Sequence, residues 1–269
     1  MPPEMSDLVN GIFSGIISNS LMDGIKSVYK KYKATWQKNT ESLNSYTADK
    51  LRNIPPKDII EPDMPLALSI LQSNAIIDNE QLRKYFANLL AASMNRNTHD
   101  MAHISFLNVL HNLSSQEALL LKTVPLLQED MPIARICYQS KYDNALKVLT
   151  KNKEQALQKP IVGNDLCFSF TSGRVLFEHY MPLKVNLTPA TLAFLLDNLV
   201  RLNLINIEYG VSLEAEGSYA AFTHTQLLDD ILQGLKDTKQ DNDDFHLVYN
   251  PGVSSPSMYG KSFYEICIK

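Results

Sequence analysis

Histidines at three positions of one short stretch are the first residues that could do chemistry. His99 and His103 lie four positions apart and His111 follows, and a helix through the first pair would bring two imidazoles together for a metal ion. A zinc site needs three or four ligands and further groups that orient them. A fourth ligand is not visible in the sequence, and His99 falls in a predicted loop. We therefore predict no metal site and interpret His103 as a helix-end or interface residue.

The cysteines give neither a metal signal nor a disulfide signal. Cys137, Cys167 and Cys267 are far apart and odd in number, which is no disulfide framework and no CxxC metal knuckle. Such usage is typical of a reducing compartment, so we expect a cytoplasmic protein with buried free thiols. No signal peptide is evident, and the most apolar stretch, Val9 to Val28, holds too many polar residues for a membrane span.

Catalytic motifs are also missing from the rest of the sequence. No GxSxG or papain-like context surrounds a serine or cysteine, and the 10 glycines form neither a GxGxxG nor a GxxxxGKS/T loop. Asp229 and Asp230, like Asp243 and Asp244, are paired acids in sequence only, which is typical of a solvated surface. We predict no catalytic residue, no cofactor and no bound metal, and interpret the protein as a non-enzyme.

Charge distinguishes the N-terminal part of the chain. The formal net charge of -4 argues against general adhesion to nucleic acid. Apolar residues nevertheless recur at helical spacing from Val9 to Trp36, with lysines in the second half of this stripe. The stripe could dock on the protein's own core or on a second copy, and an interfacial helix on anionic lipid is the alternative. The lysines that we expect to take part in an interaction are Lys26, Lys30, Lys31 and Lys33.

Helices must position most of these residues. A second helix is predicted from Glu41 to Leu51, after which Pro55, Pro56 and Pro62 forbid a continuous helix. We place a boundary near Ile54.

A helical bundle is predicted beyond this boundary. Asp78 and Gln81 have capping-box spacing ahead of an apolar stripe from Leu82 to Met94, and Ser114 with Glu117 forms a second capping box. Four helices within about 60 residues, joined by short loops, are typical of a bundle. The polar loop and helix entry between two of these helices is the surface where we expect a partner to bind. Its residues are Asn95, Arg96, His99, Asp100 and His103.

The second half of the chain predicts mixed structure. Thr188 can cap a helix that ends near Leu202, Asn203 suits a left-handed turn, and a strand follows. The other predicted segments are a helix at Lys141–Gln158 and strands at Leu166–Phe170 and Leu204–Tyr209. Two closing segments, Phe245–Tyr249 and Phe263–Ile268, have patterns of either a strand or a helix end. This order is typical of a winged helix-turn-helix whose first helix starts at Ser114 and whose third helix is Thr188–Leu202. Residues 140–187 would then be an insertion. Asp197, on the exposed side of the third helix, would repel phosphate and favours a protein–protein role.

Several of these motifs follow one another in a familiar order. They are Ile54-Pro55-Pro56, Phe86-Ala87-Asn88-Leu89-Leu90, His103 with Phe106, Leu113-Ser114-Ser115-Gln116-Glu117-Ala118, and finally Gly260, Phe263 and Cys267. The order resembles the abortive infection alpha (Abi-alpha) family of bacterial phage-defence domains, over residues 50–130 and more loosely over 185–269. One departure is Asn203, where glycine is usual in the family, and a left-handed turn tolerates asparagine.

Together these patterns predict a mainly α (α+β) fold in three parts. Residues 1–53 are expected to form N-terminal amphipathic helices, residues 54–130 a helical bundle, and residues 131–269 a mixed, winged-helix-like module. The resemblance implies a bacterial antiphage (abortive infection) protein of unestablished molecular activity. We expect it to work through protein contacts, as an accessory, sensing or effector-controlling subunit.

The expected partner is a protein, either a second copy in a homo-oligomer or another defence component. Two alternatives stay open at this point. One is a winged-helix regulator that binds nucleic acid, which the net charge disfavours. The other is an effector that makes peripheral membrane contact through its N-terminal helix.

Overall fold

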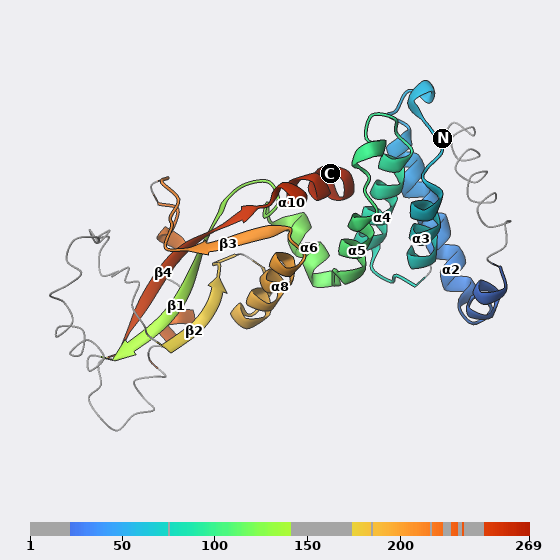
Figure 1. The fold of residues 1–269 in the computed structure, drawn as a ribbon. Coiled ribbons are helices and arrows are strands. Elements are labelled where there is room, and N and C mark those ends of the chain that lie inside the picture. Colours follow the sequence, from blue (N-terminus) through green and yellow to red (C-terminus); the bar gives the residue numbers. More distant parts are fainter. Residues whose placement is uncertain are drawn as a thin grey trace. The chain divides into compact units, whose positions relative to one another are not determined.

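The computed structural model describes residues 22–74, 76–140, 174–183, 185–215, 217–222, 227–230, 233 and 245–269. The chain forms two compact units (Figure 1). Met1–Leu127 and Met258–Lys269 make up the helical unit, and Gln128–Ser257 makes up the sheet unit, which contains a four-stranded antiparallel sheet. The predicted α+β class is therefore confirmed.

The helical unit begins with α2 (Met22–Leu51), a single helix of 30 residues. The sequence predicted one helix ending at Trp36 and another starting at Glu41, and this break is absent. Neither proline nor glycine lies between the two positions to stop the helix. Asn39, a weak helix former, is held by its amide, which donates to the carbonyl oxygens of Asn74 and Ile77 at 3.1 Å each. The stripe before Met22 lies outside the described residues.

Shorter helices follow α2 in the helical unit. They are η1 (Pro56–Asp58), α3 (Met64–Asn74), α4 (Glu80–Ser93), η2 (His99–Met101), α5 (Ser105–Asn112) and α6 (Ser115–Thr123). Helix α4 contacts α2, α3, α5 and α6, and its Tyr85, Phe86 and Leu89 are fully buried. The apolar stripe predicted for this stretch is therefore core. No helix in the described parts of the chain is long and apolar enough to cross a membrane.

Two predicted helix caps have different outcomes. The capping box at Ser114 is confirmed, because Ser114 Oγ accepts from Glu117 N at 3.2 Å and Glu117 Oε2 accepts from Ser114 N at 2.6 Å. The cap predicted at Asp78 is wrong by one residue. Asn79 caps α4 by accepting a backbone N–H of the first turn at 2.9 Å. Arg83 donates to the carbonyl oxygen of Asp78 at 3.0 Å, which anchors Asp78 ahead of the helix.

The last segment of the chain also packs in the helical unit. Helix α10 (Met258–Phe263) continues into a π-helical turn, η4 (Tyr264–Ile268). Phe263 is fully buried and lies edge-on to Phe106, with ring centroids 5.6 Å apart. Asn88 of α4 donates to the carbonyl oxygen of Cys267 at 2.8 Å. Of the two forms predicted for residues 263–268, a strand or a helix end, the helix end is confirmed.

The predicted domain boundaries after residues 53 and 130 stay predictions. Packing groups the chain differently, because Leu43 and Leu51 of α2 are buried in the same unit as α4. Residues 258–269 belong with the helices although the whole sheet precedes them.

The sheet unit has four strands in the order β2-β1-β4-β3. They are β1 (Met131–Ser140), β2 (Arg174–Tyr180), β3 (Ile205–Tyr209) and β4 (Phe245–Pro256). The sequence predicted β3 and, as one of two forms, the start of β4, but it missed β1 and β2. Strand β1 lies inside the sheet, and its buried residues come in neighbouring pairs, Ile133 with Ala134 and Ile136 with Cys137. A strand covered on both faces has no alternating pattern to recognise. The segments predicted at Lys141–Gln158 and Leu166–Phe170 lie outside the described residues.

Helix α8 (Pro189–Arg201) connects β2 to β3 along the chain. The predicted cap is confirmed, since the Thr188 hydroxyl accepts from Thr191 N at 3.1 Å. Asn203 has a φ of 57°, which confirms the predicted left-handed turn, and β3 starts two residues later.

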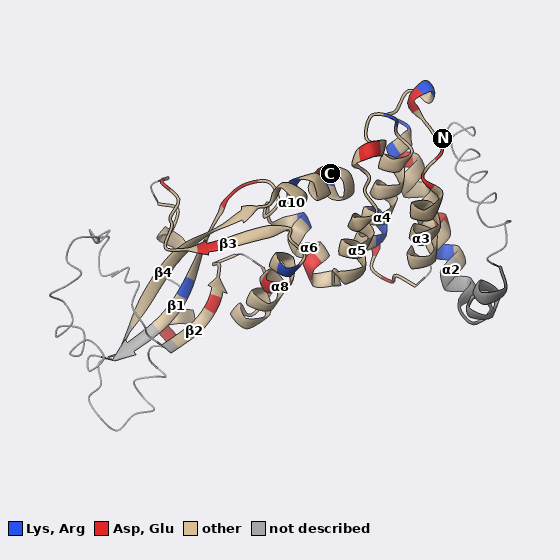
Figure 2. Ribbon diagram, in the orientation of Figure 1, with Lys and Arg blue, Asp and Glu red and all other residues tan. Residues whose placement is uncertain are grey.

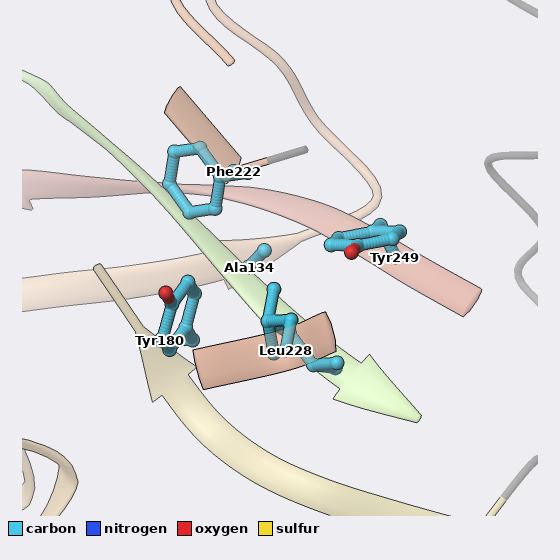
Figure 3. Packing of buried hydrophobic residues seen from close by; sticks show 6 residues of the cluster. Ala134, Tyr180, Phe222, Leu228 and Tyr249 are labelled. Atoms are coloured by element: carbon cyan, nitrogen blue, oxygen red, sulfur yellow. The ribbon is translucent and has the colours of Figure 1, made fainter. Parts of the chain in front are cut away.

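One face of the sheet carries an aromatic cluster (Figure 3). Its buried members are Ala134, Ile136, Tyr180, Phe222, Leu228 and Tyr249. Phe222 comes from η3 (Ala220–Phe222), and its ring lies edge-on to Tyr180 with centroids 5.9 Å apart. Because side chains alternate along β1, Arg135 lies on the opposite face from this cluster.

Candidate functional site

The predicted interaction loop between α4 and α5 is fixed by backbone contacts with the segment around η1. Asn95 forms an antiparallel bridge with Ile59. The backbone N–H of Arg96 donates to the carbonyl oxygen of Asp58 at 2.9 Å. These contacts define the path of the loop at its start.

Side chains of the loop complete its anchoring. Thr98 Oγ1 donates to the carbonyl oxygen of Ala92 at 2.8 Å, and His99 Nδ1 donates to that of Ser93 at 2.7 Å. Both acceptors belong to the last turn of α4, where carbonyl groups lack partners within the helix. The loop therefore also caps the C-terminus of α4.

The structure does not bring the predicted histidines together on one helix. His99 lies in η2, and His103 precedes α5, where its Nδ1 accepts from the backbone N–H of Ser105 at 3.1 Å. His111 lies on α5 beside Ser73, and burial lowers the pKa of its imidazole. Within the described residues, no group of three or more His, Cys, Asp or Glu could hold a metal ion.

The loop presents both apolar and polar side chains to solvent. Met101 and Ile104 each expose 49% of their surface, and Arg96, Asp100 and His103 are exposed between and before them. We call this set the loop surface. It consists of Asn95, Arg96, His99, Asp100, Met101, His103 and Ile104.

The other predicted site residues are placed only in part. Lys26, Lys30, Lys31 and Lys33 lie on α2, and their side chains are outside the part of the chain whose side chains the structure describes. Their role in an interaction stays a prediction.

Two of the three cysteines have the expected buried position and free thiol. Cys137 and Cys267 are buried free thiols, and burial raises the pKa of each. Cys167 lies outside the described residues.

A polar network in the sheet unit joins elements that sequence reasoning did not connect. Its members are Arg135 of β1, Glu178 and His179 of β2, Asp197 of α8 and Tyr209 of β3. We call these five residues the cross-sheet network. It lies on the face of the sheet opposite the aromatic cluster, as the alternation along β1 requires.

His179 holds the centre of the cross-sheet network in an unusual backbone conformation. Its φ is 49°, in the left-handed region that residues with side chains rarely adopt. The register of β1 and β2 shifts between Ala134 and Ile136, where β2 carries one extra residue. This β-bulge lets two consecutive residues, Glu178 and His179, both reach the network. Bulges and left-handed residues of this kind concentrate at functional sites.

The hydrogen bonds of His179 determine its tautomer. Its Nε2 lies 2.9 Å from Asp197 Oδ1, and a carboxylate only accepts, so Nε2 carries the proton. Its Nδ1 lies 2.8 Å from Tyr209 Oη and, in the neutral ring, accepts the phenol proton. The backbone N–H of His179 donates to the same oxygen at 3.1 Å. Burial raises the pKa of Tyr209 to about 12, so the phenol keeps its proton at neutral pH.

Tyr209 reaches across the sheet because β4 has a glycine beside it. Tyr209 pairs with Gly252, and a Cβ there would lie 2.8 Å from Tyr209 Cδ1 and collide with the backbone oxygen of Glu208. Further across, the guanidinium carbon of Arg135 lies 4.4 Å from the centroid of the Tyr209 ring. Arg135 Nε donates to Glu178 Oε2 at 2.7 Å, and this hydrogen bond raises the pKa of Arg135.

Chemically, the network is a chain of hydrogen bonds from the Asp197 carboxylate through the His179 imidazole to the Tyr209 phenol. Asp197 is its most accessible member, with 66% of the side chain exposed, against 15% for His179. The network therefore presents one oriented carboxylate on the surface of α8.

No spacing in the sequence could have revealed the cross-sheet network, because its members come from four distant elements. The one local signal is Gly252 inside a strand, since an isolated strand glycine indicates close approach by another group.

The match to a known protein family extends over both units of the protein. A sequence model of the family described as abortive infection alpha matches residues 35–267. The chain belongs to the abortive infection alpha family. The match includes the loop surface, the cross-sheet network and the stretch from 131 to 184 that carried no resemblance in the sequence. No curated protein and no solved structure matches this abortive infection alpha chain.

Proposed function

We propose that this abortive infection alpha protein defends bacteria against phage through protein contacts, as an accessory, sensing or effector-controlling subunit. Membership of the family supports the biological setting. The loop surface supports the contact mechanism, and it is the observation that carries the proposal.

The loop surface suits a protein partner because it is fixed and partly apolar. Met101 and Ile104 are half exposed, and exposed large apolar residues next to polar ones are typical of contact surfaces. The bonds of Thr98 and His99 to α4 hold the loop in one conformation, so a partner need not order it on binding. Arg96 and Asp100 supply polar groups of both charges for the rim of an interface.

A double substitution, Met101→Asp with Ile104→Asp, tests this proposal. Aspartates at these positions would be buried without partners in a complex, so binding and protection should both fall. The measurement is the plaque count on bacteria that express the variant, together with crosslinking of infected cells. We expect loss of protection and loss of a wild-type crosslinked species.

The matched control is Leu119→Asp on α6, where the native leucine exposes 57% of its surface in the same unit. It should leave protection and the crosslinked species unchanged. Full protection by the double variant, with a wild-type melting temperature, would overturn the proposal.

Binding of nucleic acid by a winged-helix-like module is the second candidate. It is favoured by the order of α8, the left-handed turn at Asn203, β3 and an antiparallel β4. The exposed carboxylate of Asp197 on α8 weighs against it, because it would repel phosphate. A gel shift whose affinity falls steeply with salt would favour this candidate, and the absence of any shift would reject it.

A further inference from the structure

The segment Met258–Lys269 belongs to the helical unit although the whole sheet unit precedes it in the chain. We call it the returning segment. It forms α10 and the π-helical turn η4. Because Gln128–Ser257 separates it from α6, side-chain and backbone contacts, rather than a neighbouring stretch of chain, hold it on the other helices.

Aromatic packing shapes the site that the returning segment fills. The ring of Phe106 on α5 lies 5.2 Å from that of Tyr259 and 5.6 Å from that of Phe263, between centroids. Phe263 is fully buried, and the Tyr259 hydroxyl donates to Ser105 Oγ at 2.9 Å. Aromatic pairs of this kind contribute free energy beyond their buried area. The site therefore fits a segment with two rings at this spacing.

Hydrogen bonds set the register of the returning segment in its site. Asn88 of α4 donates to the carbonyl oxygen of Cys267 at 2.8 Å, and Lys50 of α2 donates to that of Lys269 at 2.9 Å. Both acceptors lie at the end of the π-helical turn, where carbonyl groups lack partners within a helix. The site thus recognises this segment by its rings and by its terminal carbonyl groups.

The connection from the sheet to the returning segment has no slack. Strand β4 ends at Pro256 and α10 begins at Met258, so Ser257 alone separates them. The N–H of Ser257 donates to the carbonyl oxygen of Leu204 at 3.0 Å, and its hydroxyl donates to that of Asn203 at 2.5 Å. Ser257 is therefore held by the sheet unit up to the residue where α10 starts.

The other connection between the two units is also short. It consists of the exposed residues Gln128, Glu129 and Asp130, which lie between Leu127 and the start of β1. Figure 2 shows acidic positions on this connection between α6 and β1. Short connections of this kind favour the exchange of a folded element between two chains, because closing them within one chain is costly.

We propose that two copies of this chain exchange their returning segments, so that each segment fills the site on the helical unit of the other copy. The exchanged element and its site are identical in both copies, so every contact of the segment with α2, α4 and α5 is repeated between chains. A second copy is the favoured occupant because it carries the same rings and the same carbonyl groups that fit this site.

The connections, rather than the site, determine how much dimer forms. The contacts of the segment cancel between the two forms, which leaves the loss of freedom on association against the cost of closing a short connection. A chain's own segment competes at an effective concentration on the order of millimolar, so dilute protein is expected to be monomeric. Exchange also requires Phe263 to leave a fully buried position, so it should follow unfolding and refolding at high concentration.

Crosslinking of isotope-mixed full-length chains tests the exchange. Equal amounts of unlabelled and heavy-isotope protein are unfolded together in urea, refolded at several hundred micromolar and treated at once with an amine-reactive crosslinker. In the dimer fraction, about half of the crosslinks between Lys50 and Lys269 should join an unlabelled peptide to a labelled one, as random pairing of identical copies requires. Protein refolded at micromolar concentration should give this crosslink within one isotope only.

Lengthening a connection supplies the matching variant. A flexible glycine–serine insertion after Glu129 lets the segment close within its own chain and should lower the dimer fraction at least about tenfold. The control is the same insertion after Glu61, an exposed residue between η1 and α3, which should leave the dimer fraction unchanged. Thermal melting shows that both variants are folded.

Protein that stays monomeric at the highest concentration would overturn the proposal. A dimer whose crosslinks between Lys50 and Lys269 all stay within one isotope would do the same, because the copies would then meet through another surface. An unchanged dimer fraction after the insertion at Glu129 would contradict the role of the connection. None of these outcomes depends on the loop surface, so they leave the proposed function to its own test.

Discussion

At the scale of single residues, the sheet unit depends on a close approach at Gly252 and on the backbone conformation of His179. Gly252 leaves room for a tyrosine ring to cross a strand, and His179 adopts a left-handed backbone conformation at a β-bulge. The two features meet at Tyr209, whose hydroxyl bonds to His179. Together they connect both edge strands of the sheet to α8.

Gly252→Ala should destabilise the sheet unit by about 1–3 kcal/mol, the usual cost of overpacking. The new methyl group would meet the Tyr209 ring and the backbone oxygen of Glu208, and the backbone cannot move aside as a flexible side chain can. Urea denaturation followed by circular dichroism measures the change. The cost should shrink in a Tyr209→Ala background, because the ring is gone, and an equal cost in both backgrounds would contradict this explanation.

At the scale of elements, the C-terminal turn and α4 depend on each other. The π-helical turn η4 leaves the Cys267 carbonyl buried, and Asn88 of α4 is its hydrogen-bond partner. An unpaired buried carbonyl costs free energy, so this single bond ties two distant parts of the sequence together.

Asn88→Ala should lower the free energy of unfolding of the helical unit by about 1–3 kcal/mol, the cost of leaving a buried polar group unpaired. Urea denaturation again gives the measurement. Asn108→Ala on α5 is the control, because Asn108 is exposed and surface substitutions usually stay within about 0.5 kcal/mol. Equal effects of the two substitutions would show that the buried bond contributes little.

The sequence patterns correctly predicted the helix starts and the turn that are determined by residues close together in the chain. Ser114, Thr188 and Asn203 act on their own or adjacent turns, so their roles follow from spacing alone. Strand β1 could not be predicted in this way, because its pairs of buried residues reflect cover on both faces by distant segments.

Prediction of the sites was limited for the same reason. The polar character of the loop at Asn95–His103 is local and was visible, whereas Met101 and Ile104 gain their importance from an exposure that only the fold determines. The cross-sheet network depends on a bulge and on strand order, and neither leaves a spacing in the sequence.

At the scale of the whole molecule, both units bury tyrosines that resist ionisation. Burial raises the pKa to about 12 for Tyr85 in the helical unit and for Tyr209 and Tyr249 in the sheet unit. In an unfolded chain a tyrosine titrates near pH 10. The folded state therefore holds the three phenol protons more tightly than the unfolded state.

Stability should consequently fall at alkaline pH. Because the folded pKa values are raised, their contribution is fully present below about pH 10 and is lost as the pH rises towards 12. Urea midpoints measured at intervals from pH 8 to 12 test this, with phenolate absorbance recorded in parallel. Tyr249→Phe should flatten the loss for the sheet unit, and a midpoint that is constant through this range would contradict the assignment.

The place of α10 and η4 in the helical unit also sets an order of events during translation. Helices α2 to α6 leave the ribosome first, yet Phe106 and Asn88 receive their partners only when residues 263 and 267 emerge. The whole of Gln128–Ser257 is synthesised in between, which takes roughly 6 to 26 seconds at elongation rates of about 5–20 residues per second. The nascent helices thus carry an uncovered apolar site for that interval, and a chaperone that recognises such surfaces would meet this protein before residues 263 and 267 are made.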